Sequence, residues 1–137
     1  MPASFETDCA ASTLVTRLHD TANAYSTTGE AIPDRTIRIL CDGLASVHRL
    51  FAAELQAVVG APRGDCTTVV TTPAGDPLRG LLDHVADLDA QFRTVLGADL
   101  PNDIDLLIYR LYAKVRRARE RLLAVLMLKP RVSGLVA

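Results

Sequence analysis

Apolar residues recur along four stretches of the chain at steps of three and four residues, the period of a helix with one face turned inward. In the first stretch, residues 12–29, these positions are Leu14, Leu18, Ala22, Tyr25 and Gly29. In the second stretch they are Ile37, Leu40, Leu44, Val47, Phe51, Leu55 and Val58. Ser12 or Thr13 can cap the first predicted helix and Asp34 the second, with Pro33 breaking the pattern between them.

The second half of the chain carries two further helical stretches. The third predicted helix begins near Pro77, a residue suited to the first helical position, and ends at Gly97. Its inward positions are Leu78, Leu81, Leu82, Val85, Leu88, Phe92 and Val95. The fourth can be capped by Asn102 or Asp103 and stops at Pro130. Its inward positions are Ile104, Leu107, Ile108, Leu111, Val115, Ala118, Leu122, Val125 and Leu126.

The lengths of the links predict how these helices are connected. The first and third links are short, which favours antiparallel neighbours, whereas residues 60–75 lose helical periodicity and form a long connection. About 16 extended residues reach roughly 53 Å, more than the roughly 39 Å of a helix of about 26 residues. We therefore predict an all-α four-helix bundle in the ferritin-like up-down-down-up order, with a long crossover between helices two and three. The bundle domain is expected over residues 12–128, between a flexible N-terminus, 1–11, and a flexible tail, 129–137.

Several short motifs on these helices resemble those of a known bacterial family. They are Asp20, Tyr25 and Glu30 at steps of five, the Phe51, Glu54 and Leu55 of FAAEL, and the Leu100 and Pro101 that precede YRLYAKV. Over residues 13–59 and 76–126 the chain resembles the ferritin-like four-helix-bundle family catalogued as domain of unknown function 2383. That family has a longer, helical segment between helices two and three, and Arg where His48 stands. The resemblance implies the bundle fold and an accessory role in stress physiology, without a settled activity.

Composition and charge narrow the function classes. With 4% aromatic residues and no Trp, the core has to be built from Leu, Val, Ile and Ala. A net charge of −1 gives no overall attraction to nucleic acid or to an anionic membrane. No apolar run approaches the roughly 20 residues of a membrane span, and the first residues lack signal-peptide features. Cys9, Cys41 and Cys66 have no metal or redox spacing, which predicts reduced thiols in a cytoplasmic protein.

The predicted fold calls for a test of metal-ligand patterns. Ferritin-like di-metal bundles take a carboxylate from each of two helices and a Glu-x-x-His pair from each of the others. This chain contains neither Glu-x-x-His nor Asp-x-x-His. Glu54 and Asp89 lie beside the inward stripes, and Glu30 and His48 are the other conceivable ligands. Such residues more often bond to a neighbouring helix, so we expect boundary roles and no cofactor, with an atypical carboxylate metal site as the alternative.

The fourth predicted helix carries two surface patterns. The first is a basic stripe at i, i+4, i+7 and i+11, formed by Arg110, Lys114, Arg117 and Arg121. It is either a solvated face or a site for nucleic acid or an acidic partner, and the absence of interleaved aromatics argues against nucleic acid. The second pattern is an apolar strip beside the core, formed by Leu106, Tyr109, Tyr112 and Leu123. It predicts a homodimer or contact with another protein, and no membrane partner.

Catalytic motifs are missing from the sequence. It has no Gly-rich phosphate loop, nucleophile elbow, paired catalytic carboxylates or Cys beside His. His48 also lacks the Lys and Gly that follow the active histidine of phosphotransfer bundles. We therefore expect a non-catalytic structural or protein-interaction module rather than an enzyme.

Overall fold

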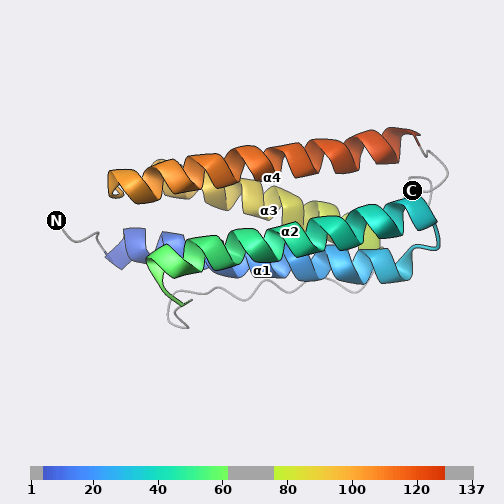
Figure 1. The fold of residues 1–137 in the computed structure, drawn as a ribbon, viewed down its shortest axis with the longest axis horizontal. Coiled ribbons are helices and arrows are strands. Elements are labelled where there is room, and N and C mark those ends of the chain that lie inside the picture. Colours follow the sequence, from blue (N-terminus) through green and yellow to red (C-terminus); the bar gives the residue numbers. More distant parts are fainter. Residues whose placement is uncertain (1–4, 62–75, 129–137) are drawn as a thin grey trace.

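The computed structural model describes residues 5–61 and 76–128, and these form an all-α bundle of four helices (Figure 1). The helices are α1 (Phe5–Ala31), α2 (Arg35–Val59), α3 (Pro77–Leu96) and α4 (Asn102–Leu128). The predicted fold class is thereby confirmed. In the described part of the chain, no helix combines the length and apolar character needed to cross a membrane.

The helices follow the predicted up-down-down-up order. In Figure 1, α1 and α4 run in one direction, and α2 and α3 run in the opposite direction. Both α1 and α4 lie against α2 and α3, so each pair of neighbours is antiparallel. Because α2 ends and α3 begins at opposite ends of the bundle, their link has to join those ends. Residues 62–75 of this link, and the predicted tail 129–137, lie outside the described residues.

Side-chain caps define the starts of α2 and α3. The Ile37 backbone N–H donates to Asp34 Oδ1 at 3.0 Å, and the Leu78 N–H donates to Asp76 Oδ1 at 3.0 Å. Each cap satisfies one of the backbone donors that a helix start leaves unpaired. Gly60 follows α2 with a φ of 91°, a conformation that glycine adopts without steric cost. The predicted cap at Asp34 and the predicted start near Pro77 are thus confirmed.

The start of α1 differs from the prediction. The helix begins at Phe5, so Ser12 and Thr13 lie inside it and the predicted flexible segment 1–11 is partly helical. Tertiary contact explains the extension, because Gln91 Nε2 of α3 donates to the Ala10 carbonyl at 2.8 Å. The apolar pattern of this segment is weak, and its support comes from a helix far away in the sequence.

Most of the predicted inward positions are buried in the core, and five others pack against it partly buried, namely Leu40, Val47, Leu82, Ile104 and Val125. One cluster contains Leu14, Leu18, Phe51, Leu55, Leu88, Phe92, Ile108 and Leu111, and the other contains Tyr25, Ile37, Cys41, Leu44, Leu81, Val85 and Leu122. Burying each Leu-sized or Phe-sized side chain favours folding by about 1.5–3 kcal/mol. Val58 is the exception, since it is 48% exposed near the end of α2. The predicted inward stripe of the second helix therefore extends about one turn past Leu55, the last buried residue of α2.

Small side chains let α1 approach its neighbours closely. α1 lies nearer to α2 and α3 than α4 does to either. Ala11, Ala22 and Gly29 are all buried on α1, and a Cβ at Gly29 would stand 3.1 Å from Cys41 Cβ. Besides the contact of Gln91 with Ala10, hydrogen bonds from Thr28 Oγ1 to the Pro77 carbonyl and from Arg49 to Ser26 Oγ tie α1 to its neighbours.

Candidate functional site

His48 lies inside the bundle and not at its boundary, which corrects the sequence prediction. Its side chain is 1% exposed, and its Nδ1 lies 2.7 Å from the Leu44 carbonyl oxygen. A carbonyl only accepts, so Nδ1 carries the hydrogen and donates. The ring centroid lies 5.0 Å from that of Tyr25 and 5.4 Å from that of Phe51. The prediction failed because α2 buries two adjacent rows of residues, against α1 and α4, where we expected one.

Burial keeps the polar groups of this region uncharged. It lowers the pKa of His48 despite the opposing hydrogen bond to Leu44, and it raises the pKa of Tyr25. It also raises the pKa of the Cys41 thiol to about 11, with a further contribution from the charge of Asp42. A thiol that stays protonated at neutral pH is a poor nucleophile and a poor metal ligand. These three side chains therefore have the character of core residues.

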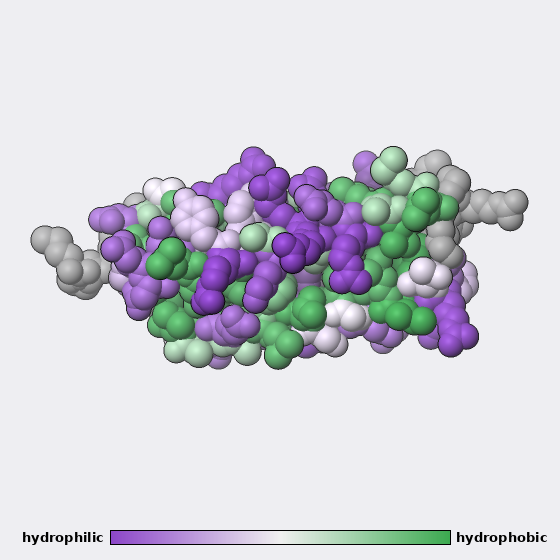
Figure 2. All heavy atoms as spheres, turned by 45° about the horizontal axis from the view of Figure 1, so that its top comes forward, coloured by the Kyte–Doolittle hydropathy of each residue, from purple (hydrophilic) through white to green (hydrophobic). Residues whose placement is uncertain are grey.

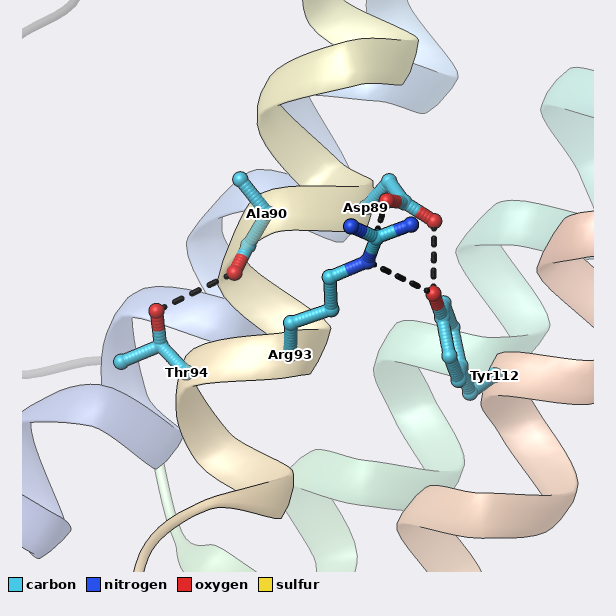
Figure 3. A network of polar contacts seen from close by, with 5 residues as sticks. All are labelled: Asp89, Ala90, Arg93, Thr94 and Tyr112. Atoms are coloured by element: carbon cyan, nitrogen blue, oxygen red, sulfur yellow. Dashed lines mark hydrogen bonds and ion pairs between the residues drawn. The ribbon is translucent and has the colours of Figure 1, made fainter.

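Asp89 belongs to a polar network that joins α3 to α4 (Figure 3). The Tyr112 hydroxyl donates to Asp89 Oδ1 at 2.8 Å, and Arg93 Nε lies 3.0 Å from Oδ2. Arg93 Nε also donates to the Tyr112 hydroxyl at 3.3 Å, and the Tyr112 ring stacks on Phe92 with centroids 5.2 Å apart. Both carboxylate oxygens are thus engaged. The expectation that Asp89 bonds to a neighbouring helix is met, and its partner Arg93 stands at the i+4 position.

The structure does not bring the four conceivable metal ligands together. Glu30 is exposed near the end of α1, Glu54 is exposed on α2, His48 is buried and Asp89 is bonded to Arg93 and Tyr112. Within residues 5–61 and 76–128, no three or more His, Cys, Asp or Glu residues gather closely enough to hold a metal ion. The alternative carboxylate site has no geometric support there.

The basic stripe is exposed on the flank of α4 that faces α2. Its four residues, Arg110, Lys114, Arg117 and Arg121, are all exposed. Lys114 Nζ lies 5.9 Å from the Phe51 ring centroid, a cation–π contact that sets the direction of this flank. Among the described residues, no carboxylate forms an ion pair with Arg110, Arg117 or Arg121. The described carboxylates therefore leave the positive charge of these arginines unneutralised.

The predicted apolar strip is only partly exposed. Leu106 and Tyr109 are exposed and Leu123 is 37% exposed, but Tyr112 is half-buried against α3. Tyr112 is therefore not part of the exposed strip, because its hydroxyl donates a hydrogen bond to Asp89 on α3. Other large apolar side chains that the sequence analysis missed are also exposed, namely Ile39, Leu50, Val58, Met127 and Leu128. Apart from Val58, these residues lie outside the predicted inward stripes. Their position outside the stripes could have been used to predict that they are exposed.

Figure 2 shows the face of the bundle on which α4 comes forward. Hydrophilic side chains gather across the middle of this face. Hydrophobic side chains gather toward its right-hand end, where α2 begins and α4 ends. Met127 and Leu128 are the most exposed large apolar residues of the described chain, at 83% and 81%. Such exposure on one face is typical of contact surfaces.

One cysteine departs from the prediction of reduced thiols. Cys9 is disulfide-bonded, whereas Cys41 is a buried free thiol. Cys66 lies outside the described residues. Cysteine spacing along the sequence could not show this pairing, because a disulfide depends on how close two residues lie in space.

Comparison of the chain with family models, with curated proteins and with solved structures finds no match. Membership of the ferritin-like bundle family therefore stays a prediction that rests on the motifs at Asp20, Tyr25, Glu30 and FAAEL.

Proposed function

We propose that this protein is a non-catalytic helical bundle that acts through protein contact, and that a second copy binds to the outer face of α4. The observation that carries the proposal is a set of exposed apolar side chains along that face. We call this set the α4 ridge, and it consists of Leu106, Tyr109, Leu123 and Met127. Water-exposed apolar side chains gathered on one face gain free energy when a partner covers them.

The α4 ridge has a self-complementary arrangement. At about 100° and 1.5 Å per residue, the four residues share one side of the helix in two pairs. Leu106 and Tyr109 form one pair and Leu123 and Met127 the other, with Ala113 and Arg116 between them. Two copies of α4 related by a two-fold axis and running antiparallel would place the first pair of each against the second pair of the other. Both pairs would then be covered at once.

The charges between the two pairs are compatible with such a dimer. Glu120 and Arg116 are both exposed on α4, and in the antiparallel arrangement Glu120 would lie about one helical turn along from Arg116 of the second copy. The remaining arginines lie at the edges, where their charges stay hydrated at the rim of an interface. The metal-binding alternative gains no comparable support from the described residues.

Compartment and physiology are separate parts of the proposal. A cytoplasmic location and an accessory role in stress remain predictions from the sequence. The disulfide of Cys9 weighs against a strongly reducing compartment, because cytosolic thiols are mostly kept reduced.

Light scattering at micromolar concentration tests the dimer. The wild type should have the mass of two chains, and Tyr109→Glu/Leu123→Glu should have the mass of one chain with an unchanged helical circular dichroism spectrum. Ile39→Glu is the matched control, because Ile39 is an exposed apolar residue of α2 outside the ridge. This control should remain dimeric. A wild type with the mass of one chain contradicts the proposal.

A further inference from the structure

A second surface lies on the flank of α4 that faces α2, beside the α4 ridge and distinct from it. We call its charged part the cationic edge, which consists of Arg110, Lys114, Arg117 and Arg121. The contact of Lys114 with the Phe51 ring shows that the edge borders α2. Tyr112, on the other flank of the same helix, contacts α3 through Asp89. These two contacts show that one flank of α4 borders α2 and the other flank borders α3.

Within residues 5–61 and 76–128, the arginines of the cationic edge have no carboxylate counterion. Cations at i, i+4, i+7 and i+11 are neighbours on a helix surface and repel one another. No carboxylate of the described chain forms an ion pair with its three arginines. Glu54 lies one turn beyond Phe51 on α2 and is exposed without an ion pair to the edge. An external anionic group would therefore relieve repulsion that the fold itself leaves in place.

Exposed apolar side chains accompany the cationic edge along α2. Val58 stands two turns beyond Phe51 on the same line of the helix, and is 48% exposed. Leu50 precedes Phe51 on the outward side and is 61% exposed. We call Leu50 and Val58 the apolar border. The surface thus joins a row of positive charge to a short row of exposed hydrocarbon.

We propose that the cationic edge and the apolar border together bind an acidic amphipathic helix of a partner protein. Carboxylates spaced by four, three and four residues on that helix would face the cationic edge, whose cations have the same spacing. Leucine-like side chains on its adjacent face would cover Leu50 and Val58. This proposal rests on the proposed function, since it takes the bundle to act through protein contact, but it uses a different surface from the α4 ridge.

A helix fits these observations better than a phosphate-rich ligand does. Phosphates would leave the apolar border uncovered, and no aromatic side chain stands within the cationic edge to stack on bases. A continuous anionic surface such as a bilayer would also meet Glu54 and Glu120, which lie exposed on either side of the edge. A single narrow helix can contact the edge without meeting Glu120. Opposite Glu54, which lies between Leu50 and Val58 at steps of four residues, it would carry an uncharged or basic residue.

Fluorescence anisotropy with the full chain tests the proposal. The probe is a labelled synthetic helical peptide with Glu at i, i+4, i+7 and i+11 and Leu on the adjacent face. A second peptide carries Gln in place of each Glu, and anionic phosphatidylserine vesicles and duplex DNA are tested in parallel. The Glu peptide should bind at low salt, more weakly as salt rises, and more tightly than the Gln peptide. Equal binding of both peptides, or binding of vesicles or DNA without the Glu peptide, overturns the proposal.

Matched variants locate the surface. Arg117→Glu/Arg121→Glu should weaken binding of the Glu peptide about tenfold, because charge reversal replaces attraction by repulsion. Leu50→Asp should also weaken it, whereas Arg79→Glu on α3 should leave it unchanged. Unchanged binding by Arg117→Glu/Arg121→Glu contradicts the assignment. The same double variant should keep the mass of a dimer in light scattering, because the α4 ridge is unchanged. A wild type that is monomeric but still binds the Glu peptide would refute the dimer proposal and leave the present proposal standing.

Discussion

The α1–α2 interface and the α3–α4 interface are built from different kinds of side chain. Between α1 and α2, the small residues Gly29 and Ala22 are buried, and Tyr25 and His48 lie in ring contact inside the core. Between α3 and α4, Phe92 stacks on the Tyr112 ring and a polar network closes the outer edge. Close approach of backbones dominates the first interface, and large rings with a partly hydrated network dominate the second.

This difference shows how burial decides what a similar group does. Tyr25 and Tyr112 are both tyrosines at helix contacts, but Tyr25 is fully buried and Tyr112 is only half-buried. The first contributes mainly through packing, in a space that a smaller residue would leave empty. The second contributes through its stacking on Phe92 and through a hydrogen bond to Asp89, whose ion-pair partner Arg93 is 72% exposed. Water and salt weaken that network, and they do not reach Tyr25.

The largest expected effect comes from truncating these two tyrosines in parallel. Tyr25→Ala should lower the free energy of unfolding by about 3–5 kcal/mol, because it leaves a cavity in the core. Tyr112→Ala should lower it by only about 1–2 kcal/mol, because the site is open to water at its edge. Urea denaturation followed by circular dichroism measures both. Equal losses would mean that the two interfaces do not differ in packing as described.

A pair of glycine substitutions tests the close approach of α1 and α2. A Cβ at Gly29 would stand 3.1 Å from Cys41 Cβ, whereas a Cβ at Gly43 would meet nothing within 4 Å. Gly43→Ala should stabilise the protein by roughly 0.5–1 kcal/mol through helix propensity. Gly29→Ala should instead destabilise it by about 1 kcal/mol, because overpacking exceeds that gain. The thermal unfolding midpoints of the two variants should therefore move in opposite directions. An equal rise in both midpoints would show that α2 can shift to accommodate a methyl group at position 29 without cost.

The smallest effect is a pH dependence that belongs to the α1–α2 interface. Burial lowers the pKa of His48 in the folded state below its ordinary value of 6.5. The unfolded chain therefore takes up a proton first as the pH falls below about 6.5. The contribution of neutral His48 to stability is complete above that pH, and is lost by at most ~1.4 kcal/mol per pH unit until the folded-state pKa is reached. Denaturation at pH 7.5 and pH 5.5 measures this loss.

Two variants assign that loss to one histidine. His48→Gln should reduce the difference in stability between the two pH values, and His19→Gln, at an exposed position of α1, is the matched control. A wild-type pH dependence that survives in His48→Gln would place its origin elsewhere in the molecule.

The periodicity of apolar residues was sufficient to predict the buried residues where a single helix face meets the core. The inward stripes of α3 and α4 match the buried positions except at Leu82, Ile104 and Val125, which are partly buried. Leu, Ile, Val and Phe at steps of three and four residues leave a helix little choice of which face is buried. It was insufficient where small residues pack. α1 contains many Ala, Ser, Thr and Gly residues whose burial follows from the approach of a neighbour and not from their own hydrophobicity.

The candidate surfaces show the same division. The spacing of Arg110, Lys114, Arg117 and Arg121 was readable in the sequence, but which helix they border was not. Tyr112 was predicted at the surface with Tyr109, and the structure separates them because its hydroxyl donates to Asp89 on α3. Lateral position around a helix depends on the neighbours, which local periodicity does not identify.

The sequence by itself determined the four helices, the cap at Asp34, the start at Pro77, most inward positions and the up-down-down-up order, because these follow from local periodicity and from the reach of each link. The predicted caps Asn102 and Asp103 instead lie inside α4. Only the tertiary structure decided that His48 is buried, that α1 extends back to Phe5 and that Asp89 is engaged by Arg93 and Tyr112. The physical reason is that burial and pairing depend on residues far apart in the chain. Their approach follows from how four helices share one core.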